Sequence, residues 1–451
     1  MRLPILIAAS LFILSGCQGK SDPPSDAPTG VAATAGDGVV LMSWDELPEL
    51  TYWIFYSQGG SVSIGQSGTI AIKNAVSPRA VIGLANDLPY SLLVNATQNG
   101  SAAGPNSPTV TAMPRLAGNI WTQGSLQGNQ DLNALAFNGL GRYVTVGDGS
   151  TIFAGDFNYG HTNPVGVTVW SPPTTPPTSP PGLPPFGDLK AVIFNGFFVA
   201  LGSNGFVATS GDGLTWTTAL SGVQNAGVTG LNGLAFGFVN GNATYIAVGN
   251  NGQIYTTNDL NLEWTRVTSA NTSNDLTSIA VLNGFFVITG SNGTLLISTD
   301  VQNWTQQQTG LPPNTTLRSA AFMPNAFGLP GAVSYAVVGD GGAVVTTTPD
   351  QVQRDPNNSN LVLPGTWATT LIPGAQNLRS VTVGGATGTR FLAVGQGGAV
   401  VFADSVINGA PVVPIQWSVA TQPQTEDLSA VHFFLGQYLA VGPAGGNAVS
   451  H

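Results

Sequence analysis

Residues 201–216 read LGSNGFVATSGDGLTW, which combines a Gly-rich bend, a short apolar run, a Ser-x-Asp-Gly turn and a tryptophan. Two interpretations compete. Either Asp212 is an acid in a ligand-binding or catalytic loop, or the stretch consists of turns that join short β-strands. Glycine is favoured in tight hairpins because it adopts positive φ freely, and Asn and Asp tolerate that conformation. No helix follows the Gly run, so the sequence does not predict a phosphate-binding loop.

The same order of features recurs through the C-terminal three quarters of the chain. A Leu-led strand such as DLKAVIF (188–194) precedes an apolar strand that ends in Gly-containing turns, such as FVALGSNG (198–205). A third strand and a Trp-bearing fourth strand complete each unit. The seven tryptophans are Trp121, Trp170, Trp216, Trp264, Trp304, Trp367 and Trp417. Repeats with the spacing of these successive tryptophans are typical of β-propeller blades.

The second strand of every unit ends in a glycine that we predict to be a hairpin residue, since hairpin turns require positive φ. These glycines are Gly147, Gly202, Gly249, Gly290, Gly339, Gly395 and Gly442. The last unit has only three strands before His451, and the stretch NIWTQG (119–124) carries a tryptophan without a blade before it. Pairing this stretch with GGNAVSH (445–451) would close a ring and hide the sheet edges. The sequence therefore predicts an all-β chain with a seven-bladed β-propeller over residues 117–451.

Two units contain a recognisable motif after the third strand. The motifs are SGDGLTW, with Ser210, Asp212 and Trp216, and STDVQNW, with Ser298, Asp300 and Trp304. They resemble the Asp boxes of sialidase-like propellers. Together with the preceding VG-x-x-G turns, the units resemble the Ycf48-like type of photosystem II assembly factor. The resemblance implies that the Asp-box residues are structural and that ligands bind on the opposite face of the propeller.

The candidate ligand face carries charged residues where each inner strand begins. They are Asp131, Asp188, Lys190, Asp275, Arg318, Arg379, Glu426 and Asp427. A sialidase requires three convergent arginines and a tyrosine activated by a glutamate. Here only Arg318 and Arg379 occupy equivalent positions, and no Arg-Ile-Pro motif precedes the repeats. The sequence thus disfavours sialidase chemistry.

Two other roles remain open for these acids. Asp131, Asp188 and Asp427 come from adjacent blades, and two of them could serve a different glycosidase as a carboxylate pair. Alternatively, an Asp before an inner strand bonds to turn amides, and Arg379 pairs with Asp427. Between the first two blades, the Pro-rich residues 170–188 predict an extended polyproline arm on the candidate ligand face or a stiff solvated insertion.

Charge and composition exclude several classes of function. The chain has 12 Lys and Arg against 22 Asp and Glu, a formal net charge of −10. This balance disfavours nucleic-acid binding, which requires clustered basic residues. His161, His432 and His451 lie far apart without metal-ligand spacing, so neither a metal nor a cofactor is expected.

The N-terminus, MRLPILIAASLFILSGCQGK, has one Arg and a short apolar run before Cys17, the only cysteine of the chain. The run is typical of a signal peptide. The stretch LSGC resembles the lipobox of bacterial lipoproteins, which implies cleavage after residue 16 and lipidation of Cys17. Residues 17–26 then form a tether. The resemblance implies a location in the bacterial cell envelope, and Gln18 implies the outer membrane or cell surface in a Gram-negative cell.

Residues 27–115 form short alternating runs, such as TYWIFYSQ, that predict an antiparallel β-sandwich. Trp44, Leu84 and Tyr90 match positions of the fibronectin type III family, which this module resembles. The resemblance implies a tyrosine corner, in which the Tyr90 hydroxyl ties a loop to a strand. It also implies a role as a spacer or in weak protein contacts.

Three hypotheses for function follow. The first is a surface-tethered, non-enzymatic binding or scaffolding lipoprotein whose propeller presents a face to an envelope protein or glycan, with Arg318 and Arg379 engaging the partner. The second is a surface glycan-processing hydrolase of the sialidase-like propeller type. The third is a structural component of a surface layer or appendage, suggested by the low content of charged residues, 8%.

Overall fold

The computed structural model describes residues 23–98, 104–126, 128, 130–157, 169–178, 187–219, 228–326, 329, 332–347, 353–355, 358–363, 367–407, 409–420 and 426–450. Cys17, His161, His451 and the predicted signal peptide lie outside these residues. The regular elements are β-strands and 3₁₀ turns, which confirms the predicted all-β fold. Within the described part, no helix is long and apolar enough to cross a membrane.

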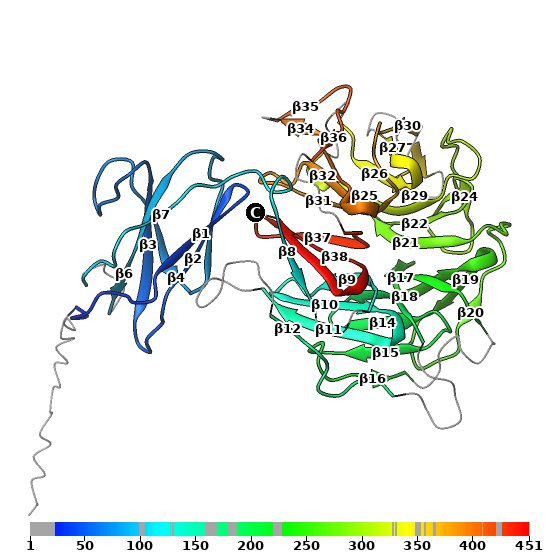
Figure 1. Cartoon of the computed structure of the whole chain (residues 1–451), viewed down its shortest axis with the longest axis horizontal. Helices are drawn as coiled ribbons and strands as arrows, with labels where there is room; N and C mark the ends of the chain where they lie inside the picture. The colour runs from blue at the N-terminus through cyan, green and yellow to red at the C-terminus, as the bar shows by residue number, and fades with distance from the viewer. Residues whose placement is uncertain are drawn as a thin grey trace, which may run out of the picture.

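The N-terminal module is a sandwich of two antiparallel sheets (Figure 1). One sheet contains β1 (Ala32–Gly36), β2 (Val39–Ser43) and β5 (Arg79–Ile82). The other contains β4 (Ile70–Ala75), β3 (Thr51–Gln58), β6 (Tyr90–Thr97) and β7 (Val110–Ala112). Both sheets contribute to one core, in which Trp44 is 1% exposed. The Tyr90 hydroxyl accepts the N–H of Ala85 at 3.0 Å, the bond expected of a tyrosine corner.

Seven four-stranded antiparallel sheets follow and form the blades of a propeller. With the inner strand first, blades 1 to 4 are β9 (Leu132–Phe137), β10 (Arg142–Gly147), β11 (Thr151–Asp156), β12 (Val169–Ser171); β13 (Leu189–Phe194), β14 (Phe198–Gly202), β15 (Val207–Ser210), β16 (Thr217–Thr218); β17 (Leu231–Val239), β18 (Asn242–Gly249), β19 (Gln253–Thr257), β20 (Thr265–Arg266); and β21 (Leu276–Leu282), β22 (Phe285–Gly290), β23 (Leu295–Ser298), β24 (Thr305–Gln306). Blades 5 to 7 are β25 (Leu317–Phe322), β26 (Tyr335–Gly339), β27 (Ala343–Thr347), β30 (Ala368–Leu371); β31 (Leu378–Gly384), β32 (Arg390–Gly395), β33 (Val400–Asp404), β36 (Ser418–Val419); and β37 (Ala430–Phe434), β38 (Gln437–Val441), β39 (Gly446–Ser450), β8 (Trp121–Ser125). Two short hairpins are inserted, β28 (Gln353–Asp355) with β29 (Asn358–Leu363) and β34 (Val406–Ile407) with β35 (Ala410–Pro411).

The ring closes between the two ends of the propeller. β8 pairs with β39, with Trp121 opposite Ser450 and Ser125 opposite Gly446. The inner strands contact one another in order from β9 to β37, and β37 contacts β9. The predicted closure, in which the N-terminal strand completes the last blade, is confirmed.

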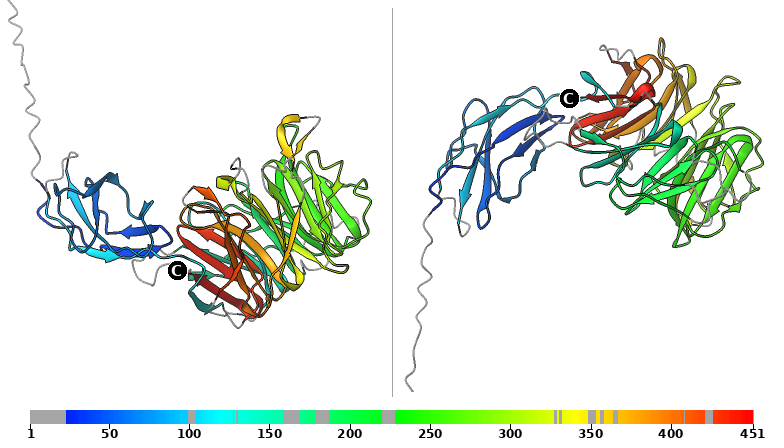
Figure 2. Two further views of the ribbon diagram at one scale, coloured as in Figure 1. Left: turned by 90° about the horizontal axis from the view of Figure 1, so that it is seen from above. Right: turned by 60° about the horizontal axis from the view of Figure 1, so that its bottom comes forward.

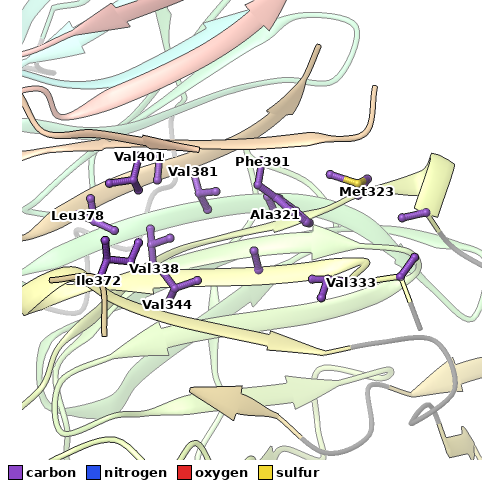
Figure 3. Close-up of a cluster of buried hydrophobic side chains, with 14 of the residues drawn as sticks. Ala321, Met323, Val333, Val338, Val344, Ile372, Leu378, Val381, Phe391 and Val401 are labelled. Carbon is purple, nitrogen blue, oxygen red and sulfur yellow. The ribbon is translucent and has the colours of Figure 1, made fainter. Parts of the chain in front are cut away.

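Apolar side chains fill the space between neighbouring blades. Figure 3 shows the cluster between blades 5 and 6, where Val338 and Val344 face Leu378 and Phe391. Phe391 is fully buried. Because each blade supplies one half of every such cluster, the blades depend on one another for burial of their apolar surface.

The glycines at the ends of the second strands have a different role from the predicted one. Gly147, Gly249 and Gly395 have φ of −161°, −165° and −169°, which is extended backbone. A Cβ on Gly395 would lie 2.0 Å from the carbonyl oxygen of Asn377 on the inner strand. These glycines are therefore required for close approach of two strands. Positive φ falls two residues later, for example at Gly397, where φ is 62°.

The Asp box of blade 2 is a network of bonds within one turn. Asp212 Oδ1 accepts the N–H groups of Leu214 and Thr215 at 2.8 and 2.7 Å, and the Ser210 hydroxyl donates to it at 3.0 Å. Trp216 Nε1 donates to the Gly213 carbonyl at 2.9 Å, and its ring packs between blades 1 and 2. The Asp300 box in blade 4 repeats the pattern. Asp212 therefore acts in the turn.

This network predicts a pH dependence of stability. The bond from the Thr215 N–H, aided by that of Leu214, lowers the pKa of Asp212 from 3.8 to about 2. A folded-state pKa below the unfolded value stabilises the fold above pH 3.8, and this contribution is lost as the pH falls towards 2. We expect wild type to have a higher thermal midpoint than Asp212→Asn at pH 6, with the difference shrinking between pH 4 and 2. A difference independent of pH would contradict the assignment.

The sandwich is docked on the propeller through the β1–β2 turn, residues 36–38. The Asp37 N–H donates to the Gly436 carbonyl at 2.9 Å, and a Cβ on Gly38 would lie 2.3 Å from that of Ala386. Leu41 on the outer side of β2 is 4% exposed and packs with Tyr143 and other propeller side chains. Figure 2 shows the sandwich beside the propeller in two further views.

A buried charged cluster lies at this interface. Asp37 is 2% exposed and accepts bonds from Asn86 Nδ2 at 2.7 Å and the Ala117 N–H at 3.3 Å. Burial raises the pKa of Asp37, opposed by the Asn86 bond and the nearby charge of Arg390. Arg390 in turn pairs with Asp404 at 2.8 Å. Because Asp37 of the sandwich and Arg390 of the propeller both bond to Ala117 in the linker, the cluster connects the two modules.

Candidate ligand site at the channel mouth

One face of the propeller carries the turns between second and third strands, residues 148–150, 203–205, 250–252, 291–293, 340–342, 396–398 and 443–445. We call it the mouth face. A cavity of 710 Å³ is lined by residues at the start of all seven inner strands. The hairpins between first and second strands and the Asp boxes lie on the opposite face, here called the hairpin face. The docked sandwich contacts hairpins 384–389 and 434–437 and therefore leaves the mouth open.

Seven equivalent residues surround the cavity. Each directly follows the leucine that recurs at the start of every repeat. These ring residues are Asn133, Lys190, Asn232, Thr277, Arg318, Arg379 and Ser429. In blades 1 to 6 the strand pairing skips the ring residue, as where Leu189 pairs with Gly202 and Ala191 with Leu201. A β-bulge re-aims the side chain of the extra residue. In these six blades the bulge is therefore the local feature that turns the ring residue towards the cavity, whereas Ser429 of blade 7 lines the cavity without one.

Three uncharged ring residues link one blade to the next. Asn133 Nδ2 donates to the Leu189 carbonyl at 2.9 Å, and Asn232 Nδ2 donates to that of Leu276 at 2.9 Å. The Thr277 hydroxyl donates to the Leu317 carbonyl at 2.5 Å. All three residues also line the cavity.

The three cationic ring residues are each paired with an aspartate. Arg318 forms a two-bond pair with Asp340, with Nε–Oδ1 at 2.5 Å and Nη2–Oδ2 at 3.0 Å. Arg379 Nη2 lies 2.8 Å from Asp427 Oδ2, the pairing considered from the sequence. The positive charges at the mouth are thus largely neutralised within the protein.

Lys190 forms the third of these pairs. Lys190 Nζ lies 2.7 Å from Asp148 Oδ1 and 3.5 Å from Asp188 Oδ2. Partial burial raises the pKa of Asp148, but bonds from Lys190 and Asn133 outweigh this effect and lower it below its usual value. Asp148 therefore remains charged at neutral pH.

A second set of residues, one position before each leucine, clamps neighbouring blades together. Its side chains accept the backbone N–H at the tip of the preceding blade's turn, at 2.7 to 3.0 Å. The bonds are Ala444 to Asp131, Gly149 to Asp188, Asn251 to Asp275, Gly341 to Asn377 and Gly397 to Asp427. We call these five acceptors the clamp residues. The turn tips have positive φ, which aims their N–H groups at the next blade.

The structure thus divides the predicted site residues into two groups. Lys190, Asp275, Arg318 and Arg379 line the cavity. Asp131, Asp188 and Asp427 are not among its lining residues and hold turns of the neighbouring blade. The uncharged ring residues Asn133, Asn232, Thr277 and Ser429 were not predicted. Aligning the repeats on their leucines, as in DLN, GLN, DLT and DLS, would have found them.

The chemistry available at the mouth is hydrogen bonding and charge pairing. Among the described residues, no three His, Cys, Asp or Glu side chains are grouped so as to hold a metal ion. His432 packs against Phe137 and Tyr143, and burial lowers its pKa to about 4. It is therefore neutral at physiological pH, and it is not among the lining residues of the cavity.

The Pro-rich arm begins along the outside of blade 2 and not at the mouth. Thr175 forms a bridge with Thr215, and the Trp216 N–H donates to the Thr175 carbonyl at 2.9 Å. Backbone bonds to an Asp-box turn place this segment on the hairpin side, which corrects the predicted position for residues 172–178. Residues 179–186 of the arm lie outside the described residues.

No protein-family model and no curated protein matches this chain. Its fold is similar to that of "YCF48 bound to D1 peptide", at 16% identity over 73% of this chain and 96% of that one, with a TM-score of 0.50. It is also similar to the WD40 β-propeller domain of Doa1, at 11% identity over 74% and 97% of the chains, with a TM-score of 0.50. Likeness at such low identity shows the fold alone. By fold, the chain is a β-propeller protein with an N-terminal β-sandwich.

Proposed function

We propose that this protein is a non-enzymatic binding lipoprotein of the bacterial cell envelope, anchored through Cys17, that holds a partner protein at the propeller mouth. One observation carries the proposal. β-Bulges in blades 1 to 6, together with Ser429 at the equivalent position of blade 7, bring one side chain per blade to a single polar cavity of 710 Å³. Binding sites are typically concave spaces on which a few polar groups converge, as they do here. The solved propeller YCF48, which is similar in fold, has been captured with a peptide.

The docked sandwich supports the same function. It contacts the hairpin face near Ala386 and Gly436, which is the side away from the mouth. In this proposal the tether continues from the sandwich. A lipid anchor on Cys17 would then leave the mouth accessible to a partner. In this proposal the sandwich, as a fibronectin type III-like module, is the spacer that sets this orientation.

The contacts of the acids give less support to a glycan hydrolase. A hydrolase requires one carboxyl group to donate a proton and another to act as base or nucleophile. Here the carboxylates of Asp131, Asp188 and Asp427 each accept a backbone N–H, and Asp427 also pairs with Arg379. These bonds hold the carboxylates against the protein.

Filling the mouth tests the proposed function. Ser429→Trp places an indole in the cavity, and Leu140→Trp places one on the hairpin face, where Leu140 is 85% exposed. We expect Ser429→Trp to reduce capture of specific partners from solubilised envelope by about tenfold, a change of about 1.4 kcal/mol. Leu140→Trp should capture the same proteins as wild type. Equal capture by both variants, with matching thermal midpoints, would contradict the proposal.

A further inference from the structure

Four of the five clamp residues carry a charge that the clamp does not need. Asn377 accepts the Gly341 N–H at 2.9 Å with an uncharged amide oxygen. At the two remaining junctions the equivalent position is Gly230 or Thr316. The fold therefore tolerates a neutral residue here, so the negative charge at the other positions has another consequence.

Acidic residues outnumber basic ones around the mouth. The acids are Asp131, Asp148, Asp188, Asp275, Asp340, Glu426 and Asp427. Lys190, Arg318 and Arg379 neutralise three of these seven charges, and the exposed Arg266 lies beside the mouth-face turn that contains Asn251, which leaves a surplus of three. Asp131 and Asp275 are exposed, and neither forms an ion pair within the described part of the chain.

Asp275 lines the cavity, and Asp131 lies just outside it on the opposite side of the ring, two residues before the lining residue Asn133. Asp131 precedes the inner strand of blade 1, and Asp275 precedes that of blade 4, which is as far apart as a ring of seven blades allows. Each has one carboxylate oxygen engaged by a turn N–H, at 3.0 and 2.9 Å. The second oxygen of each carboxylate is the acceptor that a bound cation would use.

The lining between these two carboxylates suits a polypeptide. It combines Asn, Ser and Thr residues with a similar number of apolar residues and four charged side chains, and no aromatic residue is among the described lining residues. Hydroxyl and amide groups match the donors and acceptors of a peptide backbone. A lining without aromatic rings offers no stacking surface to a sugar ring, so a peptide fits this cavity better than a glycan.

We propose that the mouth binds an extended segment of the partner protein that carries two lysine or arginine side chains, one beside Asp131 and one beside Asp275. This inference rests on the function proposed above. The ring residues bind the backbone of the segment, and the two carboxylates select its charge. The surplus negative charge also attracts such a segment before contact, an effect that salt screens.

Labelled synthetic peptides test this inference directly. The probes are 12-residue Gly/Ser peptides with two lysines at different spacings, together with the same peptides carrying glutamine or glutamate. We expect the best-spaced lysine peptide to bind wild type at least about fivefold more tightly than its glutamine analogue in fluorescence anisotropy. Asp131→Asn and Asp275→Asn should each weaken binding about two- to fivefold, and raised salt should weaken it further.

The substitutions have matched controls. Asn retains the amide oxygen that Asn377 uses in the same clamp, so both variants should keep the wild-type thermal midpoint. Glu263→Gln removes one exposed negative charge from the hairpin side of blade 3 and should not change peptide binding. If it weakens binding as much as Asp275→Asn, net charge and not the mouth is responsible, and the inference fails.

Other results separate this inference from the proposed function. Lysine peptides that bind no better than glutamine peptides overturn the inference, and so does a free diamine that competes as well as the peptide. If Ser429→Trp still abolishes partner capture in that case, the mouth remains the binding site for a different ligand. If Ser429→Trp has no effect on capture, the proposed function itself is wrong.

Discussion

Gly395→Ala is expected to lower the free energy of unfolding by about 3 kcal/mol. A Cβ at this position would lie 2.0 Å from the Asn377 carbonyl oxygen and 2.9 Å from the Leu378 Cα. Both atoms belong to the inner-strand backbone, so the clash cannot be relieved by a side-chain rotation. The inner strand must move, and Leu378, which is fully buried between blades 5 and 6, must move with it. Denaturant unfolding followed by tryptophan fluorescence measures the loss.

Gly397→Asn is the matched control, two residues away in the same turn. Gly397 has φ of 62°, and the nearest atom to its Cβ would be 3.7 Å away. Asn251 and Asn292 already adopt φ of 55° in other turns of the propeller. We expect this substitution to change the unfolding free energy by less than about 1 kcal/mol. Equal losses for both variants would show that the glycines are chosen for turn conformation, as the sequence suggested, and not for close approach.

Leu41→Asp is expected to separate the sandwich from the propeller. The Leu41 side chain is 4% exposed and packs against Tyr143, Leu439 and Val449 at the interface. An unpaired carboxylate there costs several kcal/mol unless the modules part and expose it to water. We expect a larger radius of gyration in small-angle X-ray scattering. Tryptic cleavage after Arg115, which borders the linker, should be at least about tenfold faster.

Ile82→Asp provides the control for Leu41→Asp. Ile82 lies on the same sheet of the sandwich but is 73% exposed. An aspartate at this position remains in water, so the scattering profile and the tryptic cleavage rate should match wild type. If Leu41→Asp also leaves both measurements unchanged, the docking is maintained by Asp37 and the backbone contacts alone, and the apolar contact is dispensable.

The repeat made the propeller predictable from the sequence. Each blade carries a leucine that is fully buried at the start of its inner strand, such as Leu189 or Leu276, and most carry a fourth-strand tryptophan. These residues face neighbouring blades, so their spacing reports the length of one unit. The lone Trp121 indicated the closing strand for the same reason, because every other tryptophan had a blade before it.

The ring residues were harder to predict because a β-bulge determines where they point. A prediction from alternating apolar and polar residues assumes regular strand pairing. One residue skipped in the pairing moves all following side chains to the opposite face of the sheet. Asn133 and Thr277 are ordinary polar residues at a strand start, and only the bulge aims them at the channel. The same feature misled the interpretation of Gly395, because the close contact of Gly395 with Asn377 arises at the bulge.

The sequence of β2 contains a signal for the docking of the two modules, which is easily missed when only alternating patterns are sought. The run VVLMS of β2 is buried at every position, including Val39 and Leu41 on the outer side of the sheet. A strand with one solvent face would alternate, so a continuous apolar run indicates burial on both faces. The sequence could not show which surface packs on the outer side of β2, because the hairpins around Ala386 and Gly436 lie more than 300 residues away in the chain.

Site-specific photo-cross-linking in the native envelope tests the central claim most directly. The photoreactive residue p-benzoylphenylalanine replaces Asn232, which lines the mouth cavity, or Leu140, which is 85% exposed on the hairpin face. The account predicts a discrete cross-linked partner protein from position 232 and none of that partner from position 140. The same partner from both positions, or a discrete partner only from position 140, would contradict the claim that the mouth is the binding site.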